Sequence, residues 1–141
     1  MPRLQVLGFD FGLRRIGVAV GETVTGSAHP VTTLQCAQPG QVDWDAITRL
    51  IAEWQPDALV VGLPQRDDGS DGEMAQAARR FSRRLQGRYG LTVHLVDERL
   101  SSQEARERLH DRGGRARRDK AAIDMIAASV ILETWLREHA Q

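Results

Sequence analysis

The sequence is poor in cysteine and has no long hydrophobic stretch. Cys36 is the only cysteine in 141 residues, which excludes a disulfide framework and a zinc site built from cysteines. No apolar run approaches the roughly 18 residues of a membrane-spanning helix, and the first residues, MPRLQVLGF, lack the layout of a signal peptide. We therefore expect a cytoplasmic protein with no membrane partner. The length suits one domain with its own core, residues 1–141.

Lysine is almost absent, and the charges are unevenly distributed. Of the 19 basic residues, 18 are arginine and Lys120 is the exception, a ratio that the codon usage of a GC-rich genome would also produce. The formal net charge is zero, but residues 1–78 carry 5 basic residues against 10 acidic ones, whereas residues 79–118 carry 12 against 5.

The arginines of the basic half gather in two clusters: Arg79, Arg80, Arg83, Arg84 and Arg88 at helical spacing, and Arg112, Arg115, Arg117 and Arg118 around a Gly-Gly pair. Arginine binds phosphate bidentately, so such clusters suit the backbone of a nucleic acid. A solvated surface held by salt bridges is the alternative explanation.

The hydrophobic pattern predicts a hairpin meander followed by strands that alternate with helices. The expected strands are Leu4–Phe9, Arg15–Gly21, Ser27–Gln35, Ala58–Gly62 and Thr92–Val96, and the expected helices are Val42–Trp54, Glu73–Tyr89, Ser102–His110 and Lys120–Glu138. Asp43 is the expected N-cap of the first helix. This order predicts an α/β fold with a mixed five-stranded sheet, three antiparallel strands and then two parallel ones, flanked by helices.

Three acids stand on segments that are otherwise apolar. Asp10 lies where the first expected strand ends, Glu98 follows the last one, and Asp124 interrupts the apolar helix KAAIDMIAASVILETWL. A buried charge costs several kcal/mol unless a cation or hydrogen-bond donors compensate it. Three carboxylates that converge without cysteine or histidine would form an oxygen site suited to Mg²⁺ or Mn²⁺.

Each acid also has an ordinary structural explanation. Asp10 could cap the turn that follows it. Glu98 could favour the start of a helix through the helix dipole. Asp124 could pair with a nearby arginine.

Four long motifs, in matching order, resemble a known family. They are FDFGLRRIGVAVGE, VVGLPQRDDGSDGEMAQAARRF, VDERLSSQEA and KAAIDMIAASVILETWL. From about Leu4 to Leu136 the chain resembles the YqgF family of RuvX-like proteins, known as pre-16S rRNA nucleases and elsewhere as Holliday-junction resolvases. The resemblance implies a ribonuclease H-like fold. It also implies a metal-dependent nuclease that hydrolyses phosphodiester bonds, most readily in maturation of the 5′ end of pre-16S rRNA.

Carried over by position, the resemblance implies that Asp10, Glu98 and Asp124 are the catalytic acids and hold Mg²⁺ or Mn²⁺. Ions bound there would polarise a scissile phosphate and lower the pKa of an attacking water. The usual Lys-Arg pair of the family is Arg14-Arg15 in this chain, which keeps the charge. The expected nucleic-acid-binding residues are Arg14, Arg15, Arg99, Arg115, Arg117, Arg118 and Lys120.

Asp97 and Glu98 are adjacent, and side chains alternate across a strand. Only one of the two can therefore share the face on which Asp10 presents its carboxylate. The resemblance implies that Glu98 is the metal ligand, which would turn Asp97 to the other side.

Other functions remain open from the sequence. The same fold and site would suit an endonuclease of Holliday junctions or other structured DNA, and a non-catalytic module that binds RNA or ribosomal particles is a further alternative. The expected partners are therefore pre-rRNA or single-stranded or branched DNA, together with ribosomal particles. The first motif also resembles the phosphate loop of actin-like ATPases and sugar kinases. Those proteins need two such domains, and the chain has one.

Overall fold

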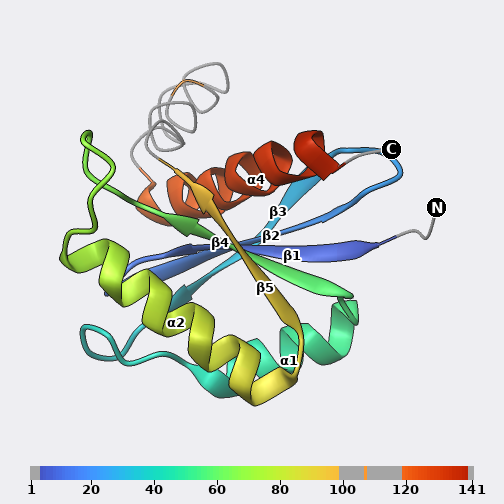
Figure 1. Ribbon diagram of the computed structural model, residues 1–141. Helices are drawn as coiled ribbons and strands as arrows, with labels where there is room; N and C mark the ends of the chain where they lie inside the picture. The colour runs from blue at the N-terminus through green and yellow to red at the C-terminus, as the bar shows by residue number, and fades with distance from the viewer. Residues whose placement is uncertain (1–3, 99–106, 108–118, 140–141) are drawn as a thin grey trace.

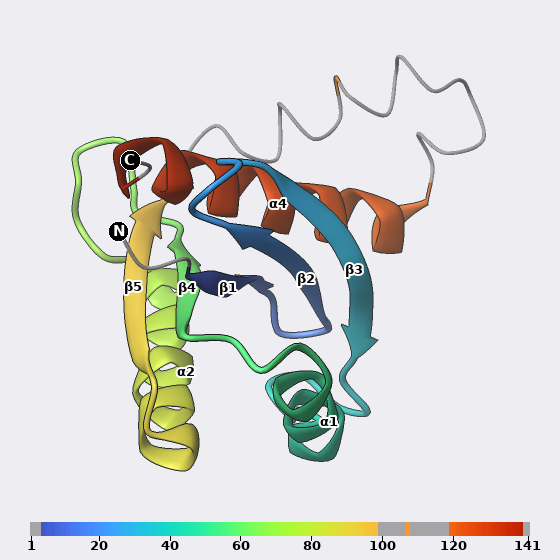
Figure 2. The same cartoon turned by 90° about the vertical axis from the view of Figure 1, so that its right-hand side faces the viewer.

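A five-stranded sheet lies between helices on both of its faces. The computed structural model describes residues 4–98, 107 and 119–139. The elements of this part are β1 Gln5–Phe11, β2 Arg15–Glu22, β3 Ala28–Gln35, α1 Trp44–Trp54, β4 Ala58–Leu63, α2 Glu73–Tyr89, β5 Thr92–Asp97 and α4 Lys120–His139. Helix α4 covers one face of the sheet, and α1 and α2 cover the other (Figures 1 and 2).

The sheet has the order β3-β2-β1-β4-β5. Strands β1, β2 and β3 pair antiparallel, and β4 pairs parallel with both β1 and β5. The predicted α/β sheet of three antiparallel and two parallel strands is therefore confirmed. Asp43 caps α1 as expected, since its carboxylate accepts a hydrogen bond of 3.1 Å from the backbone N–H of Ala46.

The first strand is longer than predicted, and this changes the position of Asp10. Strand β1 continues to Phe11, so Asp10 lies inside the strand, paired with Gly17, and not at its end. The ladder continues because the hairpin closes in a tight turn at Gly12. A Cβ at Gly12 would come within 2.7 Å of the carbonyl oxygen of Arg15. The expected helix Ser102–His110 lies outside the described residues, except for Glu107, which is helical.

Alternation along the strands produces two cores. Leu7, Phe9 and Phe11 of β1 are buried towards α1 and α2. Val6 belongs to the core beneath α4, and Gly8 and Asp10 follow it on that face because side chains alternate. Among the described residues, no helix is long and apolar enough to cross a lipid bilayer.

Glycines on this second face let α4 approach the sheet closely. A Cβ at Gly8 would come within 2.9 Å of the Leu132 Cβ, and one at Gly17 would collide with the backbone carbonyl of Asp124. The start of α4 is fixed to β3, because the Thr33 hydroxyl donates a hydrogen bond of 2.5 Å to the Ala121 carbonyl. Together these contacts place Asp124 directly above β2.

Candidate catalytic site

Asp10 and Glu98 meet on the face of the sheet beneath α4. Glu98 follows β5 and shares the face of Val96, while its backbone N–H donates a hydrogen bond of 3.3 Å to the Leu63 carbonyl. Strand β4 separates β5 from β1, and the Glu98 side chain crosses it above Gly62. Any Cβ at Gly62 would overlap the Glu98 carboxylate. The two carboxyl groups share a hydrogen bond.

Burial and mutual repulsion favour a retained proton on this acid pair. Burial raises the pKa of Asp10 to about 6, opposed by its hydrogen bond with Glu98 and reinforced by the charge of Asp124. Burial also raises the pKa of Glu98 to about 9, and the charge of Asp10 and their shared hydrogen bond act in the same direction. Near neutral pH, burial and the proximity of the two carboxyl groups therefore favour one proton held between them.

Asp124 lies near this pair but is bound to an arginine. The Arg15 Nε donates a hydrogen bond of 2.5 Å to Asp124 Oδ2. The two side chains are 29% and 21% exposed, so the ion pair is only partly screened by water. The ordinary explanation for Asp124, pairing with an arginine, is thus present in the structure. For Asp10 the ordinary explanation was capping of the turn that follows it. The Asp10 carboxyl group instead shares a hydrogen bond with Glu98.

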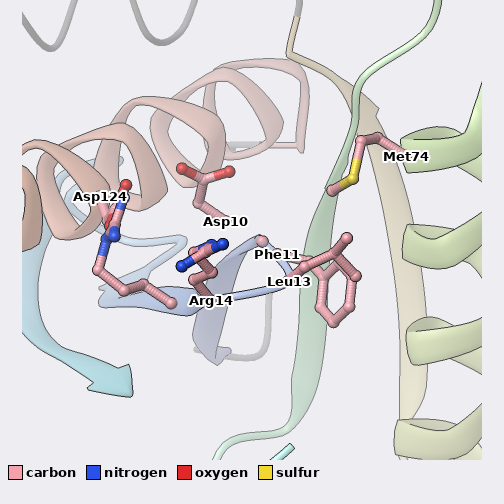
Figure 3. A pocket seen from close by; sticks show the side chains of 8 residues that line it. Asp10, Phe11, Leu13, Arg14, Met74 and Asp124 are labelled. Atoms are coloured by element: carbon pink, nitrogen blue, oxygen red, sulfur yellow. The ribbon is translucent and has the colours of Figure 1, made fainter. Parts of the chain in front are cut away.

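Two of the three acids lie at one end of a pocket of about 300 Å³. Asp10 and Asp124 stand at that end, with Arg14 beside them, and Phe11, Leu13 and Met74 lie at the other (Figure 3). Arg14 is exposed and Arg15 is half-buried. The pocket therefore joins a charged end, which suits phosphate and cations, to an apolar end, which suits a base or a sugar.

The donor chemistry of the three acids fits a hard divalent cation, but their arrangement is incomplete. Carboxylate oxygens are the ligands that Mg²⁺ and Mn²⁺ prefer. Within the residues that the structure describes, no group of three or more acidic, histidine or cysteine side chains is arranged to hold a metal ion. Asp10 and Glu98 are already together, and the Arg15 guanidinium holds the carboxylate of Asp124.

The other predicted residues fall into two groups. Lys120 is exposed at the first residue of α4, and Asp97 is exposed at the end of β5, on the opposite side of the strand from Val96. Arg99, Arg115, Arg117 and Arg118 lie outside the described residues.

Two residues that position the acids were missed by the sequence reasoning. Gly62 makes room for the Glu98 carboxylate, and Gly17 makes room for the backbone of Asp124. Each is a glycine inside an apolar strand, which is a usual sign of close approach by another group. A glycine inside an apolar strand can be recognised in the sequence, but it does not identify the group that lies against it.

The chain matches a known family over nearly its full length. Residues 4–138 match the family described as "RuvX: Holliday junction resolvase". A protein of Nitrosococcus oceani named "Putative pre-16S rRNA nuclease" is 58% identical over 137 residues, which cover 97% of this chain and 88% of the relative. A protein of the same name from Legionella pneumophila is 51% identical over 138 residues, which cover 98% of this chain and 99% of the relative.

Solved structures share the fold at low sequence identity. Thermus thermophilus RuvC in complex with a Holliday junction substrate has a TM-score of 0.58 at 14% identity, over 96% of this chain and 95% of that chain. The Fowlpox virus resolvase in complex with Holliday junction DNA has a TM-score of 0.61 at 8% identity, over 98% of this chain and 100% of that chain. The expected ribonuclease H-like fold is confirmed by these similarities.

Proposed function

The chain belongs to the RuvX family, and on this premise we propose that it is a divalent-metal-dependent nuclease that cleaves pre-16S rRNA at its 5′ end. The observation that carries the proposal is the buried pair of Asp10 and Glu98, of which Asp10 lines a pocket together with Arg14 and Arg15. Burial of two adjacent acids is costly, and a bound cation would compensate it. The names of the relatives support pre-rRNA as the substrate.

Asp10 and Glu98 would hold Mg²⁺ or Mn²⁺, and Asp124 would complete the set once Arg15 releases it. When bound, the ion supplies polarisation of the phosphate and lowers the pKa of an attacking water. A substrate phosphate competes with Asp124 for the Arg15 guanidinium, because both are anions that accept hydrogen bonds from it. Substrate binding would therefore free the third carboxylate.

Arg14 and Arg15 would bind the phosphates on either side of the cleaved bond. Arg14 is exposed at the rim of the pocket, where it is free to turn towards a strand. Contacts of this kind give affinity and register without reading the base sequence. Lys120, exposed at the start of α4, adds a further positive charge on the same side as Asp124.

A second candidate substrate is the Holliday junction, which the description of the matching family favours. A resolvase that cuts two strands symmetrically requires a two-fold dimer. In the described part of the chain, the exposed large apolar side chains are Leu13, Val24 and Leu95, on three different segments. Because they come from three different segments, they give no support for one apolar dimer surface in this part of the chain, so we place the junction second.

The test is a cleavage panel with Mg²⁺ and with Mn²⁺. The substrates are a labelled pre-16S rRNA leader, single-stranded DNA and a four-way junction, and the control protein is Asp10→Asn. We expect cleavage of the leader, lost in the control. Cleavage of the junction alone would select the second candidate. Tight binding of the leader without cleavage under either metal would contradict the nuclease and indicate a binding module.

A further inference from the structure

The arginines of α2 divide into two groups that lie on adjoining flanks of the helix. Arg80, Arg84 and Arg88 are spaced by four residues and form one exposed stripe, which we call the α2 stripe. Arg79 and Arg83 lie on the adjoining flank of the helix, because each successive residue is turned by about 100°. Arg79 is bound to Asp71 at 2.6 Å, and Gln65 donates a hydrogen bond of 2.9 Å to the same carboxylate. Arg79 therefore connects the loop before α2 to the helix through its ion pair with Asp71.

No ion pair occupies the α2 stripe within the described residues. The salt bridges of this part join Arg15 to Asp124, Arg79 to Asp71 and Arg137 to Glu133. The alternative explanation of the cluster, a surface held by salt bridges, thus applies to Arg79 and not to the stripe. Three exposed arginines in a row present a continuous set of donors for anions.

A recess of about 120 Å³ lies beneath the α2 stripe. Arg80 and Arg84 stand at it, and Phe11 and Phe81 provide apolar rings, stacked with their centroids 4.8 Å apart. The opposite wall is the chain at Gly40, whose backbone N–H donates a hydrogen bond of 2.8 Å to the Leu13 carbonyl. The recess therefore has an apolar interior and positively charged side chains at its edge.

The recess adjoins the catalytic pocket. Both are lined by Phe11 and Leu13, which lie at the end of the catalytic pocket away from Asp10 (Figure 3). Leu13 is 41% exposed, so an apolar side chain stands at the border between the two. At the far end of the stripe, the Arg88 guanidinium lies over the Trp44 ring, 4.2 Å from its centroid. The catalytic pocket thus adjoins the recess at Leu13, and the recess adjoins the stripe at Arg80 and Arg84.

We propose that the α2 stripe and the recess beneath it bind the single-stranded flank of the polynucleotide that is cleaved at Asp10. This rests on the proposed nuclease function and extends it to a second binding surface. The arginines donate to successive phosphates, and Leu13, which is exposed at the mouth of the recess, contacts a base. A base reaches an apolar recess only when it is unpaired, which selects a single strand over a duplex.

The test measures binding in the presence of EDTA, so that no cleavage occurs. The protein with Arg80→Ala and Arg84→Ala is titrated into labelled oligouridylate of about 12 nucleotides, and into one of about 4 nucleotides, which makes fewer phosphate contacts. The matched control carries Arg49→Ala in α1 and Arg137→Ala in α4, which remove the same charge from exposed positions on other helices. Alanine is a good helix former, so both proteins should keep their thermal midpoint.

We expect the stripe variant to bind the longer strand about tenfold more weakly, with its salt slope reduced by about 1.4 for two lost phosphate contacts. The shorter strand should lose less affinity in the variant than the longer strand does, and the control should bind both strands like the wild type. Equal weakening in variant and control would overturn the proposal, because it would indicate general charge attraction. No weakening in either would overturn it too.

Two further binding measurements identify the type of nucleic acid that the stripe binds. They also separate this proposal from the proposed function. Oligothymidylate of the same length shows whether the flank is recognised as RNA, DNA or both. An equal loss of affinity for a duplex would contradict single-strand selection. Because binding is measured without cleavage, a wild type that cleaves nothing can still support the stripe. A stripe variant that binds the longer strand normally refutes the stripe even if the nuclease is active.

Discussion

At the scale of single residues, the adjacent acids Asp97 and Glu98 offer a direct test of the site. Asp97 is exposed, whereas Glu98 crosses Gly62 and reaches Asp10. We expect Glu98→Gln to abolish cleavage and Asp97→Asn to keep measurable turnover. The measurement is the cleavage rate at saturating Mn²⁺, with the thermal midpoint of both variants as a control for folding. An inactive Asp97→Asn protein beside an active Glu98→Gln protein would show that the second ligand is misassigned.

A second prediction at the scale of single residues concerns Arg15. Its guanidinium would compete with a bound cation for the carboxylate of Asp124. An ion pair at this exposure contributes on the order of 1 kcal/mol. We expect Arg15→Ala to bind Mn²⁺ about fivefold more tightly in the absence of nucleic acid, since about 1.4 kcal/mol corresponds to a factor of ten. The measurement is isothermal titration calorimetry, and Arg14→Ala is the control, since Arg14 is not paired with Asp124. Unchanged or weaker Mn²⁺ affinity in Arg15→Ala would show that the pair does not hold back the third ligand.

At the scale of elements, Gly62 in β4 determines whether Glu98 can reach Asp10. A Cβ there would overlap the Glu98 carboxylate and press on Ile131 of α4. We expect Gly62→Ala to lose most of its activity and about 1–3 kcal/mol of unfolding free energy, the usual cost of overpacking. The measurements are urea unfolding and the cleavage rate.

The control for Gly62→Ala is Gly87→Ala in α2, where an added Cβ meets nothing within 4 Å. Because alanine favours a helix, that variant should gain about 0.5–1 kcal/mol and keep its activity. A Gly62→Ala protein as active as the Gly87→Ala protein would show that the path over β4 is not needed.

The element pattern was predictable from the sequence, and the close approaches between elements were not. Hydrophobic alternation and a capping residue depend on local chemistry, so the strands, α1 and the division into three antiparallel and two parallel strands followed from them. The extension of β1 through Asp10 depends on the tight turn at Gly12. The contact of Asp124 with Arg15 joins residues 109 positions apart. Such contacts are set by the packing of α4 on the sheet, and no local pattern encodes them.

At the scale of the whole molecule, the fold brings three acids together at one site, where burying their charges costs free energy. The acids come from the centre of the sheet, from its edge strand and from α4, so the site exists only when all three are assembled. Their identities were implied by the family resemblance, whereas the proton shared by Asp10 and Glu98 was not. That proton follows from burial, which a sequence does not show.

The pH dependence of stability is the prediction that belongs to the whole molecule. The folded pKa values of Asp10 and Glu98 lie above their ordinary values near 4, at about 6 and about 9. In that window the folded state binds protons that the unfolded chain has lost, so stability falls as the pH rises from about 4 towards 9. Asp10→Asn removes the contribution of the Asp10 carboxyl group to this fall in stability. In EDTA we expect its thermal midpoint to exceed that of the wild type near pH 8 by more than near pH 5, with each kcal/mol worth about 2–4 °C.

Mn²⁺ should reverse the same loss in the wild type, because the cation displaces the shared proton and binds only the folded site. The expected gain in thermal midpoint on adding Mn²⁺ is therefore larger near pH 8 than near pH 5, where protons compete for the carboxylates. Asp10→Asn should gain little at either pH, because one of the two assembled ligands is missing. The measurement is thermal unfolding of both proteins with EDTA and with excess Mn²⁺ at each pH. An equal gain in both proteins would place the bound metal away from Asp10 and Glu98.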